Sequence, residues 1–217
     1  GANPQPALEK LEQLNSVVPS SVLADKKLAE VYYMNNRFDK ASEAYARFIH
    51  SSETTEDDLV KYAFALFLNH DFEESLEVAN LGSKRNARHA AFNRLAMYNY
   101  TDMKRYDDAQ KAADAFFNAA DKADYSYLDY MYYGHLLNAL KKYDEAVMQY
   151  QKAIELDTSK TELWREISNA YEQKNDYTDA IVAYQKYYEA LHADEQTADL
   201  QFQIGKLYYG DCTSGSR

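Results

Sequence analysis

Residues 141–157 read KKYDEAVMQYQKAIELD, and related stretches recur along the chain. They are FDKASEAYARF from residue 38, FEESLEVANLG from 72, YDDAQKAADAF from 106 and YTDAIVAYQKY from 177. In each stretch an aromatic residue is followed three positions later by a small one: Ala41, Ser75, Ala109, Ala146 and Ala180. These small residues are 34, 34, 37 and 34 positions apart. A fixed period of this length indicates a repeat architecture.

A second helical pattern lies upstream of each small residue. Its members form pairs at i and i+4, on one helical face: Leu28 and Tyr32, Tyr62 and Leu66, Ala96 and Tyr100, Tyr133 and Leu137, Ile167 and Tyr171. Each unit is therefore predicted to be two short helices, with turns near residues 36, 70, 104, 141 and 175. The chain has only six Gly and three Pro, which also favours helices over many strands and tight turns.

The period divides the chain into five complete units. They are predicted to span 22–55, 56–89, 90–123, 127–160 and 161–194, with 124–126 as an insertion. Residues 1–21 are predicted to hold a partial repeat, the second helix only, because Ala7, Leu11 and Leu14 repeat the pattern. Residues 195–217 are predicted to be either the start of a sixth unit, marked by Ile204, Gly205 and Tyr208, or a capping helix with a tail.

The units resemble tetratricopeptide repeats (TPR), whose signature is W-x2-L-G-x2-Y followed by A-x3-F. The matching residues in the fifth unit are Trp164, Ile167, Ser168, Tyr171, Ala180 and Tyr184. The Tyr- and Asn-rich composition is similar to that of bacterial exported TPR scaffold proteins. The resemblance implies an all-α, right-handed superhelix of about twelve antiparallel helices. Three residues depart from the family pattern: Ser75 and Gly82 in the second unit and Met97 in the third.

Two kinds of local feature are expected to support these helices. Small residues are needed where the two helices of a unit cross, so Ala109, Ala146 and Ala180 are predicted to be buried. Two sequence pairs resemble capping boxes, in which side chains satisfy the free N–H groups of a helix start: Thr55 with Asp58, and Ser159 with Glu162.

Composition argues against several classes of function. A net charge of −11 disfavours nucleic-acid binding, and no apolar run approaches the roughly 20 residues that span a bilayer. The five His do not lie at metal-ligand spacing, and no catalytic or cofactor motif stands out. We therefore expect no enzyme activity, metal or cofactor. The single cysteine, Cys212, leaves the compartment undetermined, with a periplasmic or exported location slightly favoured over a cytoplasmic one.

The resemblance implies where a ligand would bind. In TPR arrays the first helix of each unit lines a concave groove that holds extended peptides or partner helices. By register, the predicted groove residues are Phe64, Phe67, Arg94, Tyr98, Met131, His135, Arg165 and Asn169. The alternative is that the aromatic residues pack within the array. A chaperone-tail carboxylate clamp is not expected, since Glu30 would repel a carboxylate and Ala91 carries no charge.

The favoured interpretation is a protein–protein interaction scaffold that binds a peptide or partner helix and has no catalysis of its own. The alternative is the recruiting or sensor segment of a larger multidomain enzyme or regulator. The sequence indicates a protein or peptide partner, and it names neither that partner nor the oligomeric state.

Overall fold

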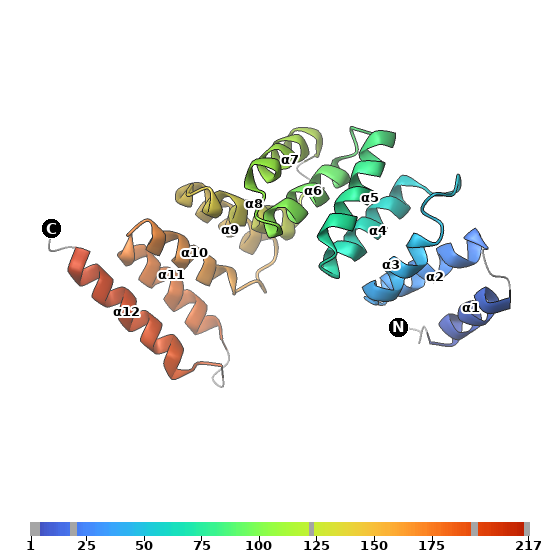
Figure 1. Cartoon of the computed structure of the whole chain (residues 1–217). Helices are drawn as coiled ribbons and strands as arrows, with labels where there is room; N and C mark the ends of the chain where they lie inside the picture. Colours follow the sequence, from blue (N-terminus) through green and yellow to red (C-terminus); the bar gives the residue numbers. More distant parts are fainter. Residues whose placement is uncertain (1–4, 18–20, 122–123, 192–194, 215–217) are drawn as a thin grey trace. The chain divides into compact units, whose positions relative to one another are not determined.

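The computed structural model describes residues 5–17, 21–121, 124–191 and 195–214, and these contain twelve α-helices and no β-strand (Figure 1). The helices are α1 (Gln5–Val17), α2 (Val22–Met34), α3 (Phe38–Ala46), α4 (Glu56–Leu68), α5 (Phe72–Arg85), α6 (Ala90–Asp102), α7 (Tyr106–Ala119), α8 (Tyr127–Ala139), α9 (Tyr143–Leu156), α10 (Leu163–Gln173), α11 (Tyr177–Ala190) and α12 (Ala198–Ser214).

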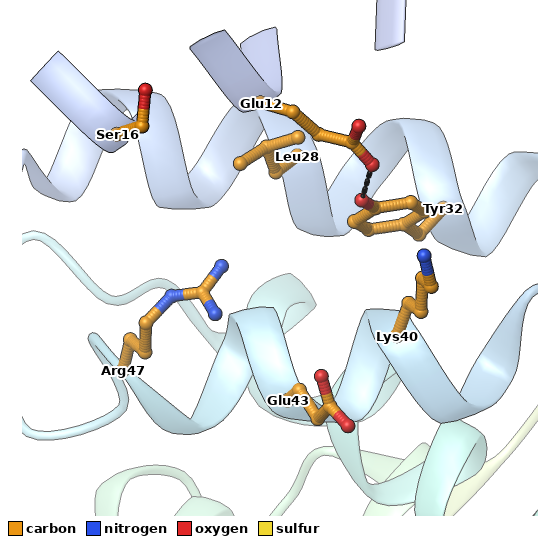
Figure 2. Close-up of a pocket in the computed structure, with 7 residues that line it drawn as sticks. All are labelled: Glu12, Ser16, Leu28, Tyr32, Lys40, Glu43 and Arg47. Atoms are coloured by element: carbon orange, nitrogen blue, oxygen red, sulfur yellow. Dashed lines mark hydrogen bonds between the residues drawn. The ribbon is translucent and has the colours of Figure 1, made fainter. Parts of the chain in front are cut away.

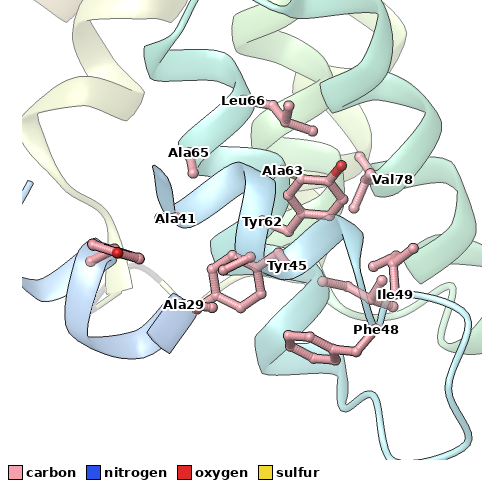
Figure 3. Packing of buried hydrophobic residues seen from close by; sticks show 14 of the residues in the cluster. Ala29, Ala41, Tyr45, Phe48, Ile49, Tyr62, Ala63, Ala65, Leu66 and Val78 are labelled. Carbon is pink, nitrogen blue, oxygen red and sulfur yellow. The ribbon is translucent and has the colours of Figure 1, made fainter. Parts of the chain in front are cut away.

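The helices pack as consecutive antiparallel pairs within two compact units. The unit of residues 1–119 holds α1 and the pairs α2/α3, α4/α5 and α6/α7. The unit of residues 120–217 holds α8/α9, α10/α11 and then α12. The predicted all-α architecture of paired helices is confirmed. Each unit has its own buried apolar residues, which come from both helices of its pairs, and Figure 3 shows part of the cluster in the unit of residues 1–119.

The turn inside each pair has the same backbone geometry five times. Its central residue is left-handed, and these residues are Asn36, His70, Lys104, Lys141 and Asn175, all at the predicted turn positions. At the first turn, the N–H of Asn36 donates to the carbonyl of Tyr33, and the N–H of Arg37 donates to the carbonyl of Tyr32. This is the Schellman motif, which satisfies the last carbonyls of a helix. All five central residues carry a Cβ, although glycine adopts this conformation at lower cost.

Replacing Lys141 by Gly is therefore expected to stabilise the fold. The φ of Lys141 is 62° and its side chain is exposed, so the substitution removes left-handed strain without removing packing. The expected gain is about 0.5–1 kcal/mol in the free energy of unfolding, measured by chemical denaturation. The neighbouring Lys142→Gly, at a φ of −91°, is the control and should be neutral or destabilising. A loss of stability in Lys141→Gly would contradict the prediction.

The small residues lie where the helices cross. Ala109, Ala146 and Ala180 are fully buried, as predicted. Ser75 holds the equivalent position in the second unit, and its hydroxyl donates to the carbonyl of Ala63 on the facing helix over 2.7 Å. A serine is therefore accommodated at this crossing because its one polar group is hydrogen-bonded.

One predicted capping box is confirmed and the other is wrong. Thr55 and Asp58 form the reciprocal box at the start of α4. Ser159 does not pair with Glu162, because α10 begins only at Leu163 and the Ser159 hydroxyl donates to Asp157 instead. A box that sequence reasoning missed joins Ser126 and Asp129 at the start of α8. Ser126 had been assigned to the insertion rather than to a helix start.

Two glycines mark places where a ring lies against a helix backbone. A Cβ on Gly134 would lie 2.6 Å from the Tyr150 ring of the paired helix α9. A Cβ on Gly82 would lie 2.2 Å from the ring of Phe92 on α6. Gly82 therefore departs from the family pattern because Phe92 occupies the volume of the missing side chain.

Two equivalent positions link the helices of the first unit and of the fifth unit by different interactions. In the first unit the link is an ion pair, with Nε of Arg47 2.6 Å from the carboxylate of Asp25. The same two positions in the fifth unit hold Lys186 and Trp164, with the ammonium 4.2 Å from the ring centre. In both cases a cation on the second helix or at its C-cap is attracted to negative charge or π density on the first helix.

Candidate interaction surface

The predicted groove residues lie on the first helices of the pairs, four in each compact unit. Phe64 and Phe67 are on α4, and Arg94 and Tyr98 are on α6. Met131 and His135 are on α8, and Arg165 and Asn169 are on α10. We refer to this side of the helices as the first-helix face. A single stripe that runs through all eight residues stays a prediction.

Three of the predicted aromatic residues lie together in the unit of residues 1–119. The ring centres of Phe64 and Phe67 are 6.0 Å apart, and those of Phe67 and Tyr98 are 5.6 Å apart. Phe67 also contacts Phe72 of α5, with 5.9 Å between ring centres. Only 6% of Phe67 and 1% of Tyr98 is exposed. The expectation of exposed rings is therefore wrong for these two residues, which pack between helices, while Phe64 is half-buried.

Arg94 has a contact on the neighbouring helix. Its guanidinium lies 4.9 Å from the ring centre of Phe116, a fully buried residue of α7. The side chain is half-buried. Binding of an acidic group by Arg94 stays a prediction.

The charged residues between α2 and α4 are paired with one another. The ammonium of Lys26 lies 2.6 Å from the Asp58 carboxylate, and that of Lys61 lies 2.5 Å from Asp57. Asp58 also accepts hydrogen bonds from the N–H and hydroxyl of Thr55. The cations that a carboxylate clamp would require are thus already neutralised within the fold. The absence of such a clamp stays a prediction.

Asp58 should make stability depend on pH in the acid range. Burial alone would raise the pKa of its carboxyl, but hydrogen bonds from Lys26 and Thr55 outweigh burial and lower the pKa below 3.8. Stability from this group is present above the unfolded pKa and is lost as pH falls through the folded one. We expect Asp58→Asn to cost about 1–2 kcal/mol at neutral pH, with the difference shrinking in acid.

The measurement is the denaturation midpoint of both proteins as a function of pH. Asp57→Asn is the matched control, because Asp57 is an exposed neighbour that pairs only at the surface, where ion pairs contribute little. A stability difference between wild type and Asp58→Asn that stays constant down to low pH would contradict the role given to the ionised Asp58 carboxylate.

In the unit of residues 120–217, none of the four predicted residues is fully buried. Met131, His135 and Asn169 are half-buried, and Arg165 is exposed. Nδ1 of His135 lies 3.1 Å from the hydroxyl of Tyr150, which positions the imidazole. The Arg165 guanidinium lies 5.7 Å from the ring centre of Tyr187 and 3.6 Å from Glu166. This surface therefore combines an exposed cation with partly exposed sulfur and ring atoms.

Sequence reasoning missed two exposed aromatic residues on α12. Phe202 is 66% exposed and Tyr209 is 74% exposed. They lie seven residues apart on one helical face, at the positions that Met131 and Asn138 hold in the fourth unit. Carrying the register on from Gly205 would have identified both, because Gly205 marks the same point of the repeat as Gly134.

Within the residues that the structure describes, no group of three or more His, Cys, Asp or Glu side chains could hold a metal ion. No helix in that part of the chain is both long and apolar enough to cross a membrane.

Residues 134–175, from the middle of α8 to the turn after α10, match the family model described as TPR repeat. That segment is a TPR repeat. The matched segment includes the stretch at 141–157 from which the period was first recognised. TPR repeats generally mediate protein–protein interactions. No curated protein matches the sequence.

Several solved structures share the fold. One is the C-terminal part of a TPR repeat-containing protein from Cytophaga hutchinsonii, with 24% identity and a TM-score of 0.61 over 70% of the chain. The chain spans 58% of that structure. MamA from Desulfovibrio magneticus has 15% identity and a TM-score of 0.65, with 78% of this chain and 94% of MamA covered. The Cut9–Hcn1 hetero-tetramer of APC/C has 14% identity and a TM-score of 0.72, with 92% and 39% covered.

Proposed function

We propose that this TPR protein is a non-catalytic scaffold that binds a peptide or partner helix on the first-helix face. The observation that carries the proposal is the exposure of Phe202 and Tyr209 on α12. Aromatic residues are typical anchors of protein–protein contacts. The partner is expected to bring apolar side chains to these rings.

The charges on the same face indicate which polar group the partner carries. Arg165 is exposed on α10, and Lys206 is exposed on α12 between the two aromatic residues. The protein as a whole is acidic, so the charge of these basic groups is opposite to the net charge of the chain. Such a combination favours a segment with apolar anchors and an acidic group. Half-buried Met131 and His135 offer further apolar contacts.

A random peptide library selected on the purified protein tests the proposal. We expect the enriched peptides to contain apolar residues and an acidic residue. The double variant Phe202→Ser with Tyr209→Ser and the single variant Arg165→Glu should each weaken binding at least about tenfold, which is about 1.4 kcal/mol. Affinities are measured by titration calorimetry.

Val182→Ser is the matched control, because Val182 is an exposed apolar residue on α11, a second helix. Circular dichroism should show unchanged helix content in all variants. Selected peptides that bind the Phe202/Tyr209 variant as tightly as the wild type would refute the proposal.

A further inference from the structure

The hollow among α1, α2 and α3, of about 330 Å³, offers a partner no apolar anchor. Leu28 and Tyr32, which line it, are only 2% and 6% exposed. Arg37 and Lys40 cover the Tyr32 ring, at 5.2 and 5.6 Å from its centre. The Tyr32 hydroxyl donates to the Glu12 carboxylate (Figure 2). The large exposed rings lie instead on α12, which leads to the first-helix face of residues 120–217.

Nine residues of α8, α10 and α12 form three rows across this face. α9 packs against both α8 and α10, and α11 packs against both α10 and α12, so the three first helices follow one another. On each helix the three members are four and then three residues apart, which places them along one side of it. The Arg165 row is Met131, Arg165 and Phe202, the middle row is His135, Asn169 and Lys206, and the Glu172 row is Asn138, Glu172 and Tyr209.

The three rows differ in chemistry. The middle row is polar on every helix, whereas the exposed rings lie in the outer rows: Phe202 is 66% exposed and Tyr209 is 74% exposed. On α10 the outer rows carry opposite charges, because Arg165 and Glu172 are both exposed and lie seven residues apart. Glu166 lies 3.6 Å from Arg165, and surface pairs of this kind contribute little. The face therefore attracts an acidic group at one outer row and a basic group at the other.

The polar middle row favours an extended partner over a helical one. A partner helix buries a continuous apolar stripe, and across this face that stripe would lie on His135, Asn169 and Lys206. Removing the Lys206 ammonium and the Asn169 amide from water without new hydrogen bonds is costly. An extended chain has free backbone N–H and C=O groups that can bond to these side chains. It also sends successive side chains to opposite sides, so they reach the two outer rows alternately.

The distance between the helices sets the spacing of the partner's residues. Packed helices lie about 8–10 Å apart, and in the unit of residues 1–119 successive first helices touch through Phe67 and Tyr98. An extended chain rises about 3.3 Å per residue, so it passes from α10 to α12 in about three residues. Because three is odd, the side chain that reaches α12 faces the opposite outer row. An acidic residue at Arg165 therefore places its neighbour at Glu172, and the residue three positions away at Tyr209.

We propose that the partner is an extended segment with an acidic residue, a basic residue directly beside it and an apolar residue three positions from the acidic one. The acidic residue binds Arg165, the basic residue binds Glu172 and the apolar residue packs on the ring of Tyr209. The backbone between them lies over Asn169 and Lys206. This inference rests on the proposed function and specifies the partner of the same face.

Charge exchange between protein and peptide tests the assignment. The probe is the tightest peptide from the random library, labelled with fluorescein, and affinities are measured by fluorescence anisotropy. Replacing its acidic residue by Lys should weaken binding to the wild type at least about tenfold, and Arg165→Glu should restore most of the loss. Replacing its basic residue by Glu should act in the same way, with Glu172→Lys restoring binding. Glu155→Lys makes the same change on the second helix α9 and should restore nothing.

The outcomes separate this inference from the proposed function. Peptides that require Phe202 and Tyr209 but lack either rescue would overturn the inference and leave the proposed function standing. The same conclusion follows if the acidic and apolar residues of the selected peptides lie about seven positions apart, since that spacing covers about 10 Å in a helix. Peptides that bind the Phe202→Ser, Tyr209→Ser variant as tightly as the wild type would refute the proposed function itself, and the inference with it.

Discussion

Gly82→Ala is expected to lower the free energy of unfolding by roughly 1–3 kcal/mol. The added methyl group would lie 2.2 Å from two carbons of the Phe92 ring and 2.6 Å from a third. Phe92 is almost completely buried, so its ring cannot move away without disturbing the contact between α5 and α6. A loss of stability would identify the clash with Phe92, because Gly→Ala inside a helix otherwise stabilises by about 1 kcal/mol.

Gly205→Ala provides the matched control. Gly205 lies inside α12, and a Cβ placed there meets no atom within 4 Å. This variant should therefore be more stable than the wild type. A second variant that combines Gly82→Ala with Phe92→Leu should recover part of the lost stability, since the smaller side chain makes room for the methyl group. Chemical denaturation followed by circular dichroism measures all three, and a stabilising Gly82→Ala would refute the packing argument.

Met97→Ala is expected to cost about 2–5 kcal/mol. In the fourth unit, Gly134 on the first helix leaves room for the ring of Tyr150 on the second. The third unit holds Met97 and Ala113 at the same two positions, so the large residue is now on the first helix. Both are fully buried. Met97 therefore supplies the volume that a ring supplies in the fourth unit, and its removal leaves a cavity.

A large side chain on α7 in place of Met97 on α6 tests whether residues 97 and 113 fill the same space. Ala113→Phe alone should overpack the crossing and destabilise by about 1–3 kcal/mol. The combination of Met97→Ala and Ala113→Phe should be more stable than the sum of the two single effects predicts, because the two residues share one space. Strict additivity in this double-mutant cycle would show that the two side chains do not occupy the same volume.

The sequence was sufficient to predict the helix pairs, the turns and the buried small residues. Ala146 and its equivalents recur because every crossing needs close backbones, so the requirement appears in each unit. The pairing of Gly82 with Phe92 could not be predicted. It joins one unit to the next, and a period identifies equivalent positions without showing which residue compensates another.

The candidate surface was predicted only in part, for a related reason. Register placed Phe67 and Tyr98 on the first helices, but it does not tell how far neighbouring side chains cover them. Their burial depends on ring contacts between α4, α5 and α6. Phe202 and Tyr209 were missed because the groove positions were assigned only in the complete units and not on the helix that contains Gly205.

The pairing of Trp164 with Lys186 has a spectroscopic consequence. Trp164 is the only tryptophan in a chain with 21 tyrosines, and it lies between α10 and α11 against a cation. Its fluorescence therefore reports the state of one helix pair, whereas far-ultraviolet circular dichroism reports all helices together. In repeat arrays each unit contacts only its neighbours. Comparison of the two signals during denaturation would thus show whether this pair melts with the remaining helices or separately from them.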